Sequence, residues 1–388
     1  MSAIRQPARL RYQIVTITVT RTLINTAYRL VYPFLPTIAR GLGVDLEAVA
    51  LAITARSSLG LLGPAFGVIA DRRGRRAGML IGLIAVIAAL LLMTILPLYG
   101  IFFAGLLLLG AGKIVFDTSM QAYVGDRVDY RRRGLAIGLT ELAWSAAYLV
   151  GIPVAGWLIA RGGWNAAFPW LAALLLGCCV LLALLVSGGR GSGSQPPALP
   201  DAIRALLTYR SALAALTVSL LITFANELVS IVFGVWLEDA FGLQIAALGA
   251  ASIVIGVAEL GGEGLVIGVV DRLGKRRAVA LGAAASVLSA LALPALGTSV
   301  EGSLLGLFLF YLTFEATLVT SIALMTEIAP ERRATLLAGN VAFVSFGRMV
   351  GAPLGTALFA GGIAANAAAA ALAYLLALGV VILFVQQE

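Results

Sequence analysis

The sequence contains no histidine and few charged residues. Only 12% of the 388 residues are charged, whereas a soluble domain carries about 25%. A histidine-ligated metal site is therefore excluded, and any proton relay must use carboxylates. The only two cysteines, Cys178 and Cys179, are adjacent in an apolar run. Because neighbouring helical positions point in different directions, we interpret them as small apolar residues rather than as a structural disulfide.

What the sequence has in abundance is apolar residues. Hydrophobic residues make up 61% of the chain, and the mean hydropathy is +1.01. A soluble protein of this size could not bury so much apolar surface, which excludes a soluble enzyme, a disordered chain and a disulfide scaffold. The chain also lacks a nucleotide-binding loop, a metal-ligand cluster and a Ser/His arrangement. We therefore predict no enzyme activity, no cofactor, no metal and no nucleic-acid partner.

The apolar residues fall into twelve segments, each long enough to cross a bilayer, which takes roughly 20 residues. The sequence thus predicts an all-α polytopic membrane protein with twelve transmembrane helices. The expected spans are 12–39, 47–70, 77–96, 101–124, 134–160, 164–186, 211–237, 245–270, 278–296, 302–328, 334–360 and 363–385.

The basic residues in the connections predict the orientation. If both termini are cytoplasmic, the cytoplasmic tail, connections and linker hold twenty arginine and lysine residues, against Arg40 and Arg161 on the other side. Cytoplasmic loops of membrane proteins carry such an excess of positive charge. We expect a multi-pass protein of a bacterial-type inner membrane with both termini in the cytoplasm.

The two halves of the chain are related to each other. Residues 187–200 read SGGRGSGSQPPALP, a linker composition without apolar periodicity. We expect a first six-helix bundle over 1–186, a linker over 187–210 and a second bundle over 211–388. A shift of 200 positions superposes like residues: Asp71 on Asp271, Gly74 on Gly274, Arg75 on Lys275, Gly151 on Gly351 and Pro153 on Pro353. Such repeats bind substrate near the membrane midplane, between the halves.

The loop after the second segment, 67–76, reads GVIADRRGRR, and 268–277 reads GVVDRLGKRR. The first loop resembles the signature of the major facilitator superfamily, G-x-x-x-D-R-x-G-R-R/K, and the second is a weaker copy. The resemblance implies two pseudo-symmetric bundles and a cytoplasmic latch that favours the outward-open state. The alternative is a solvated basic loop that only sets topology. The implied latch residues are Gly67, Asp71, Gly74, Arg75, Asp126, Asp271, Gly274 and Lys275.

Two features resemble the drug:proton antiporter branch of that family. Pro33 and Pro36 form a P-x-x-P ending of the first helix, and Gly151, Pro153 and Gly156 are similar to the branch's glycine–proline motif in the fifth. The chain departs from the branch in lacking an arginine in the first half of the fourth helix. The resemblance implies proton-coupled export and a hinge in helices 5 and 11 at Gly151, Pro153, Gly351 and Pro353.

Eleven charges lie at bilayer depth, away from the ends of the predicted spans. The first half holds four cations and two acids, and the second half one cation and four acids. Charges at this depth are costly and mark substrate or ion pathways. The resemblance implies that helices 1, 4, 7 and 10 line a cavity, for which we nominate Arg21, Asn25, Arg29, Lys113, Asp117, Asn226, Glu227, Glu315 and Arg348.

Acids without a cation can take up protons. Glu227 is the first candidate, followed by Glu315, Asp117 and Glu141, and then by Glu259 and Glu263. The alternative is that the charges only pair with each other. Lys113 and Asp117, four positions apart on a helix, can pair, and Arg29 with Asp117 and Arg348 with Glu259 are further possibilities.

These observations favour a secondary active transporter that moves a small amphiphilic or charged molecule by alternating access. Proton-coupled efflux, in a monomer surrounded by lipid, is the first hypothesis. The alternative is an uncoupled facilitator, or an exporter of lipid, lysophospholipid or sugar type, in which buried charges act as gates. A transporter-like receptor or scaffold is a third reading.

Overall fold

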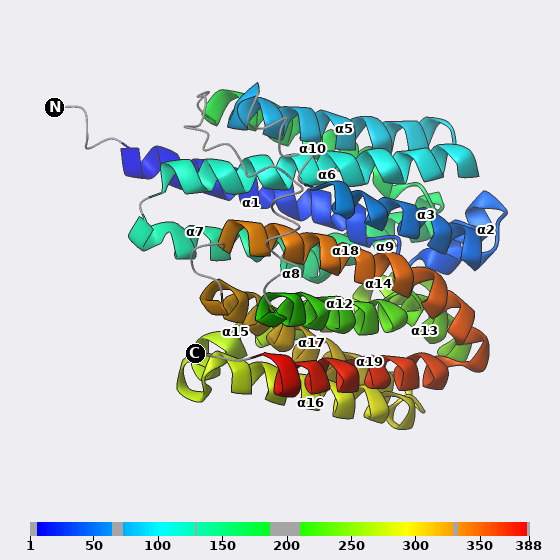
Figure 1. The fold of residues 1–388 in the computed structure, drawn as a ribbon. Coiled ribbons are helices and arrows are strands. Elements are labelled where there is room, and N and C mark those ends of the chain that lie inside the picture. Colours follow the sequence, from blue (N-terminus) through cyan, green and yellow to red (C-terminus); the bar gives the residue numbers. More distant parts are fainter. Residues whose placement is uncertain (1–5, 64–72, 129, 187–209, 329–332, 386–388) are drawn as a thin grey trace. The chain divides into compact units, whose positions relative to one another are not determined.

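The structure, a computed structural model, describes residues 6–63, 73–128, 130–186, 210–328 and 333–385. All regular elements among these residues are helices (Figure 1). Ten of the described helical segments are long and apolar enough to cross a membrane. The other two expected spans are 12–39, which the structure divides between two helices, and 47–70, of which residues 64–70 lie outside the described residues.

The first expected span is broken rather than continuous. Helix α1 (Gln6–Arg29) ends before a turn at residues 30–34, and α2 (Leu35–Leu42) follows. Pro33 lies in this turn, and Pro36 lies in the first turn of α2, where a missing N–H is tolerated. Gly43, at φ 68°, ends α2 in the left-handed conformation. The P-x-x-P sequence therefore marks a break in this helix.

Helices α5 (Arg75–Ile95) and α6 (Tyr99–Arg127) pack closely against each other. A Cβ added to Gly82 would lie 2.7 Å from the backbone nitrogen of Phe116, and one added to Gly112 would lie 3.0 Å from Val86 Cγ2. Small residues at a helix interface allow this approach, which gives membrane helices their van der Waals contact. Helix α10 (Ala167–Leu185) packs against α5 and α1.

The fifth expected span contains an irregular turn. Helix α7 (Tyr130–Glu141) and the short α8 (Ala143–Ala146) are followed by a π-helical turn, Ala147–Gly151, and then by α9 (Ile152–Gly162). The π turn ends two residues before Pro153, whose ring removes an N–H donor from the helix. Single π turns inside α-helices are frequent at functional sites.

The second half repeats most of these elements. It contains α12 (Arg210–Ser230), α13 (Phe233–Phe241), α15 (Ile253–Leu273), α16 (Lys275–Leu296), α17 (Val300–Ile328), α18 (Arg333–Leu358) and α19 (Ile363–Phe384). Helices α1 and α12 end at positions 201 apart, and α6 and α17 also begin and end 201 apart. The halves differ at the hinge candidates, because Pro353 lies inside the continuous helix α18.

The close contacts divide the chain into two compact units. The first comprises 1–44, 62–194 and 245–253, and the second comprises 45–61, 195–244 and 254–388, as far as these ranges are described. Each unit therefore includes one segment from the other sequence half. Helix α3 (Leu46–Ser58) packs on α18, and α14 (Ile245–Ala251) packs on α9. A Cβ added to Gly156 of α9 would lie 3.2 Å from the Cα of Gly249 on α14, so these two helices nearly touch. The predicted bundle boundaries at 186 and 211 stay a prediction.

Gly151 and Gly351 allow close helix approach in their own units. A Cβ on Gly151 would lie 2.7 Å from Thr26 Cγ2 on α1, and a Cβ on Gly351 would lie 2.7 Å from Glu227 Cβ on α12. These glycines therefore hold the fifth helix against the first, and the eleventh against the seventh.

We expect Gly151→Ala to destabilise the protein, because the new methyl group overlaps the side chain of Thr26. Overpacking of this kind costs about 1–3 kcal/mol, which a thermal melt of the purified protein measures. The matched control is Gly177→Ala on α10, where nothing lies within 4 Å of an added Cβ, and where alanine favours the helix. Removing the Thr26 side chain should relieve the overlap, so the free energy of unfolding of Gly151→Ala with Thr26→Gly should exceed the value obtained by adding the effects of the two single changes. If it does not, the contact between residues 151 and 26 does not set this packing.

Candidate functional site

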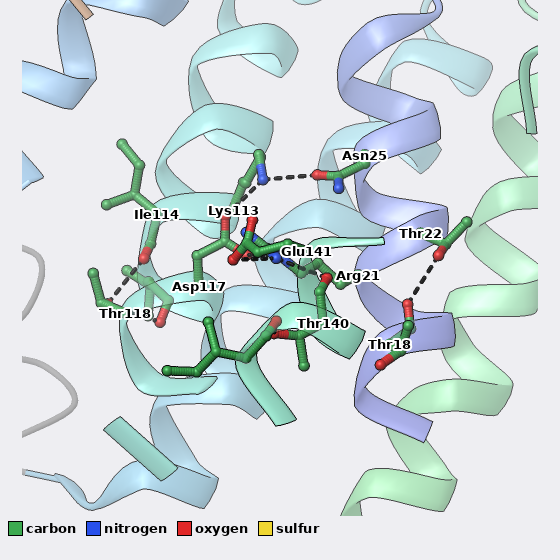
Figure 2. A network of polar contacts seen from close by, with 12 residues as sticks. Thr18, Arg21, Thr22, Asn25, Lys113, Ile114, Asp117, Thr118, Thr140 and Glu141 are labelled. Carbon is green, nitrogen blue, oxygen red and sulfur yellow. Dashed lines mark hydrogen bonds and ion pairs between the residues drawn. The ribbon is translucent and has the colours of Figure 1, made fainter. Parts of the chain in front are cut away.

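A network of buried charges joins three helices of the first unit (Figure 2). Arg21 on α1 lies with Nε 3.2 Å from Asp117 Oδ1 on α6 and with Nη1 2.8 Å from Glu141 Oε1 on α7. The same Nη1 donates to the backbone carbonyl of Thr140 at 2.8 Å. Arg21 is 3% exposed. One guanidinium, with five donors in a fixed plane, thus connects the first, fourth and fifth spans.

Lys113 forms the second cationic centre of this network. Its Nζ lies 2.6 Å from Asp117 Oδ2, which confirms the pair expected from the spacing of four residues. Asp117 therefore accepts from Lys113 with one oxygen and from Arg21 with the other. Lys113 also donates to Asn25 Oδ1 on α1 at 2.8 Å. The sequence-predicted residues Arg21, Asn25, Lys113, Asp117 and Glu141 lie together.

Asn25 has a hydrogen-bonding group that the described residues leave unmatched. Its side chain is fully buried, and its Nδ2 has no acceptor among the residues that the structure describes. A buried donor without a partner costs about 1–3 kcal/mol. The amide orientation follows from Lys113, because an ammonium can only donate and so must face the amide oxygen. The amide nitrogen is then left to donate elsewhere.

Aromatic rings surround the two cations at the other end of the cluster. The Arg29 guanidinium carbon lies 4.4 Å from the ring centres of both Trp144 and Tyr148. Lys113 Nζ lies 4.5 Å from the centre of Trp144 and 5.7 Å from that of Tyr28. Cations are attracted to aromatic faces at these distances. Sequence reasoning missed all three rings, although Trp144 and Tyr148 follow Glu141 at helical spacings of three and seven.

The network is open to its surroundings on one side. Arg21 and Lys113 are buried, whereas the side chains of Asp117 and Glu141 are 19% and 36% exposed. Tyr28, Arg29 and Trp144 are also half-buried. Arg21 and Lys113 are therefore held inside the unit, and the two acids form its accessible part together with Tyr28, Arg29 and Trp144.

The second unit contains a neutral polar chain at the repeated position. Ser230 Oγ lies 3.1 Å from Asn226 Oδ1 and 2.7 Å from the hydroxyl of Tyr311 on α17. Asn226 is 6% exposed, and its Nδ2 also has no acceptor among the described residues. Tyr311 was not nominated from the sequence. The sequence could have indicated Tyr311, because α17 repeats α6, the helix that contributes Lys113.

The predicted proton sites of the second unit occupy different environments. Glu227 and Glu259 are each 2% exposed. Glu263, Glu315 and Arg348 are half-buried. Glu315 lies beside α15, where a Cβ on Gly262 would be 2.8 Å from Glu315 Cβ. The suggested pair of Arg348 with Glu259 stays a prediction.

The described basic residues of the signature loops make matching contacts within their own units. Arg75 Nε lies 3.2 Å from Asp126 Oδ2, which confirms the expected partner, and Lys275 pairs with Glu327. Glu327 was missed, although it follows Asp126 by 201 positions. Two backbone contacts are also repeated: Arg76 donates to the carbonyl of Ala183, and Arg276 to that of Ile382.

The loop glycines adopt the conformation that the turn requires. Gly74 and Gly274 have φ values of 87° and 79°, which favour glycine. Gly67 and Asp71 lie outside the described residues. Asp271 lies in α15, and its side chain is likewise not described. The inter-bundle latch that the resemblance implies therefore stays a prediction.

Comparison with known proteins decides the family. Residues 17–316 match the family description "Major Facilitator Superfamily". The chain belongs to the major facilitator superfamily. It is 26% identical over 339 residues to the MFS-type transporter YwfA of Bacillus subtilis (strain 168), covering 84% of this chain and 79% of that protein. It is 27% identical over 286 residues to the class C tetracycline resistance protein of Escherichia coli, covering 69% and 70%.

A solved structure shows the same fold. The crystal structure of a D-xylose-proton symporter aligns with a TM-score of 0.76 at 16% identity, covering 95% of this chain and 97% of that chain. Membership of the major facilitator superfamily makes the protein a multi-pass membrane transporter. The expected fold class is confirmed, and the charges of the first unit lie in a protein that moves solutes.

We expect Asp117→Asn to destabilise this transporter strongly. Removing one member of a buried ion pair leaves its partners uncompensated, at a cost of about 3–5 kcal/mol, and Asp117 serves both Arg21 and Lys113. A thermal melt measures the loss. The control is Thr118→Val on the same helix, because the Thr118 hydroxyl bonds the α6 backbone at Ile114 and Val115. Equal melting temperatures for Asp117→Asn and Thr118→Val would contradict this account of the cluster.

Proposed function

We propose that this transporter exports a small amphiphilic or charged organic molecule in exchange for protons, by alternating access. The observation that carries the proposal is the buried cluster around Arg21, Lys113 and Asp117. Ionisable groups inside membrane proteins are costly and mark substrate and ion pathways. Five charged side chains held in one unit are difficult to explain as packing alone.

The name of one relative, a resistance protein, fits export of an organic molecule better than its uptake. One relative is a tetracycline resistance protein, which matches this chain over 286 residues. The structural neighbour is named as a proton symporter, and this likeness concerns the fold alone. Export of an organic molecule in exchange for protons would account both for a relative that confers tetracycline resistance and for the carboxylates buried in this chain.

The second unit supplies the first candidate for the proton site. Glu227 is 2% exposed on α12, beside the Asn226–Ser230–Tyr311 chain. A carboxylic acid in such a place can alternate between a protonated form and an ion-paired form. In this scheme, a proton that enters from outside competes with the substrate for the cavity acids. Glu315, Asp117, Glu141, Glu259 and Glu263 follow Glu227 as candidates.

Two further roles are proposed for residues outside the cluster. The pairs Arg75–Asp126 and Lys275–Glu327 fix the signature loops, which would present Asp71 and Asp271 as parts of a cytoplasmic latch. Gly151 and Pro153, with the π turn before them, and Gly351 and Pro353 would act as hinges of the fifth and eleventh helices. The transporter is proposed to work as a monomer in the bacterial inner membrane, with both termini in the cytoplasm.

Proton coupling can be tested in everted vesicles whose lumen is acidified by respiration. We expect a transported compound, found by screening cationic, anionic and zwitterionic amphiphiles, to accumulate in the lumen and to collapse the pH gradient as it does so. Nigericin, which dissipates that gradient, should stop accumulation. Glu227→Gln should lower gradient-driven accumulation at least ten-fold, because an amide cannot carry the proton.

The matched control is Glu301→Gln, which neutralises an exposed acid in the first turn of α17. Its accumulation should stay within two-fold of the wild type. Accumulation that is indifferent to the pH gradient would refute proton coupling and favour the uncoupled facilitator. Normal proton coupling in Glu227→Gln would show that Glu227 does not carry the proton and that one of the other acids does.

A further inference from the structure

We propose that the end of α9 binds a phospholipid whose headgroup carries a net negative charge. The guanidinium of Arg161 would hold the phosphate of the lipid, and the ring of Trp157 would lie beside the upper part of its acyl chains. This inference concerns the surface that the first unit presents to the bilayer. It goes beyond the proposed transport function and does not depend on it.

Four residues of the fifth span form an exposed stripe along one face of the helix. Val150, Val154, Trp157 and Arg161 follow one another at spacings of four, three and four, which place them on the same face. The first three are 63%, 53% and 50% exposed, and Arg161 is exposed as well. They belong to the apolar segment Ala136–Gly162, which is long enough to cross a membrane. An exposed apolar stripe on such a segment faces lipid, so Arg161 ends a lipid-facing stripe.

The charge of Arg161 is turned back along this stripe. Its guanidinium carbon lies 3.8 Å from the centre of the Trp157 ring, one helical turn earlier. Helical side chains lean toward the N-terminus of their helix, which at the end of a span is the direction of the membrane interior. Tryptophan rings at the ends of spans lie at the level of the lipid headgroups. The guanidinium therefore lies at headgroup level, where its planar fork can meet a phosphate.

The described part of the chain supplies no anion for this cation. No carboxylate among the described residues lies within ion-pair distance of Arg161, whereas the buried cations Arg21 and Lys113 are paired with acids. The sequence contains no aspartate or glutamate between Glu141 and Asp201. Phosphate is the anion that a bilayer offers at headgroup level, and arginine can bind it with two parallel hydrogen bonds.

A headgroup with a net negative charge fits this site better than a zwitterionic one. The cation of a zwitterionic headgroup neutralises its own phosphate and competes with Arg161 for it. A net negative headgroup leaves the phosphate to the protein. The lipid chains would then follow the exposed side chains of Trp157, Val154 and Val150 into the bilayer, so a phosphate without chains loses this contact.

The second half of the chain shows that the arginine and the tryptophan are not needed to end the helix. Positions 201 residues after Trp157 and Arg161 hold Leu358 and Gly362. The eleventh helix, α18, nevertheless forms and ends at Leu358. A glycine with positive φ follows the helical segment in both halves, Gly163 at 91° and Gly362 at 74°. The two side chains are thus an addition of the first half to a helix end that forms without them.

The test is a lipid titration of the whole chain in neutral detergent, labelled with 5-fluorotryptophan and followed by fluorine NMR. The chain has five tryptophans, and the resonance of Trp157 is the one that Trp157→Leu removes. We expect phosphatidylglycerol to shift this resonance to saturation at a concentration at least five-fold lower than phosphatidylcholine with the same chains. At that concentration, diacylglycerol, which has no phosphate, and glycerol 3-phosphate, which has no chains, should each give less than one fifth of the shift.

One substitution and two controls locate the binding at this helix end. Arg161→Gln should raise the half-saturating concentration of phosphatidylglycerol at least five-fold, to that of phosphatidylcholine. The first control is Arg40→Gln, which removes the other cation expected on this side, next to Gly41 and its neighbour Trp164; it should change the value less than two-fold. The second is the resonance of Trp170, a 60% exposed ring on α10, which should respond equally to both phospholipids.

Three results would overturn the proposal. The first is equal half-saturation by phosphatidylglycerol and phosphatidylcholine, and the second is a full shift of the Trp157 resonance by diacylglycerol or by glycerol 3-phosphate. The third is an equal effect of Arg161→Gln and Arg40→Gln, which would indicate a general attraction of anionic lipid to a basic protein. If Arg161→Gln does not fold, the comparison of the four probes on the wild type decides. Because transport does not enter the measurement, failure of proton-coupled export would leave this site intact.

Discussion

The first unit depends on Arg21. A single guanidinium reaches from α1 to Asp117 on α6 and to Glu141 and the Thr140 carbonyl on α7. Because Asp117 also binds Lys113, and Lys113 also binds Asn25, the position of each charge constrains the next. A change at one member leaves another charge buried without compensation, which is costlier than the loss of the contact itself. The network therefore fixes how the first, fourth and fifth spans meet, and it makes their arrangement sensitive to charge.

Such a network stabilises an arrangement only while its charges balance. Binding or release of an ion at one member alters the energy of all the others. A transporter needs this property, since its ligand must favour one arrangement of the helices over another. The second unit has a different design, with a neutral Asn226–Ser230–Tyr311 chain and the buried acids Glu227 and Glu259. The two halves thus share a fold and differ in the polar and charged residues that they bury.

The sequence predicts the features that depend on local spacing. The Lys113–Asp117 pair follows from one turn of helix, and the glycine turns at Gly74 and Gly274 follow from the loop motif. The family and its all-helical fold follow from composition, segment count and that motif. The sequence alone does not predict which helices become neighbours, so the reach of Arg21 to Glu141 and the rings around Arg29 were not foreseen. Nor does it reveal the π turn at Ala147–Gly151, or the packing of α3 and α14 with helices of the other half.

The central claim is that the buried charges of the first unit act as one network, so that removing a single charge is costlier than removing a matched pair. The most direct test compares the thermal melts of Asp117→Asn and of the double change Lys113→Phe with Asp117→Leu, which leaves Arg21 with Glu141. Removing one partner of a buried ion pair costs about 3–5 kcal/mol, whereas replacing the whole pair with apolar residues is often neutral or stabilising. We therefore expect the single variant to melt well below the wild type and the double variant to melt close to it. A double variant that melts as low as Asp117→Asn would contradict the account.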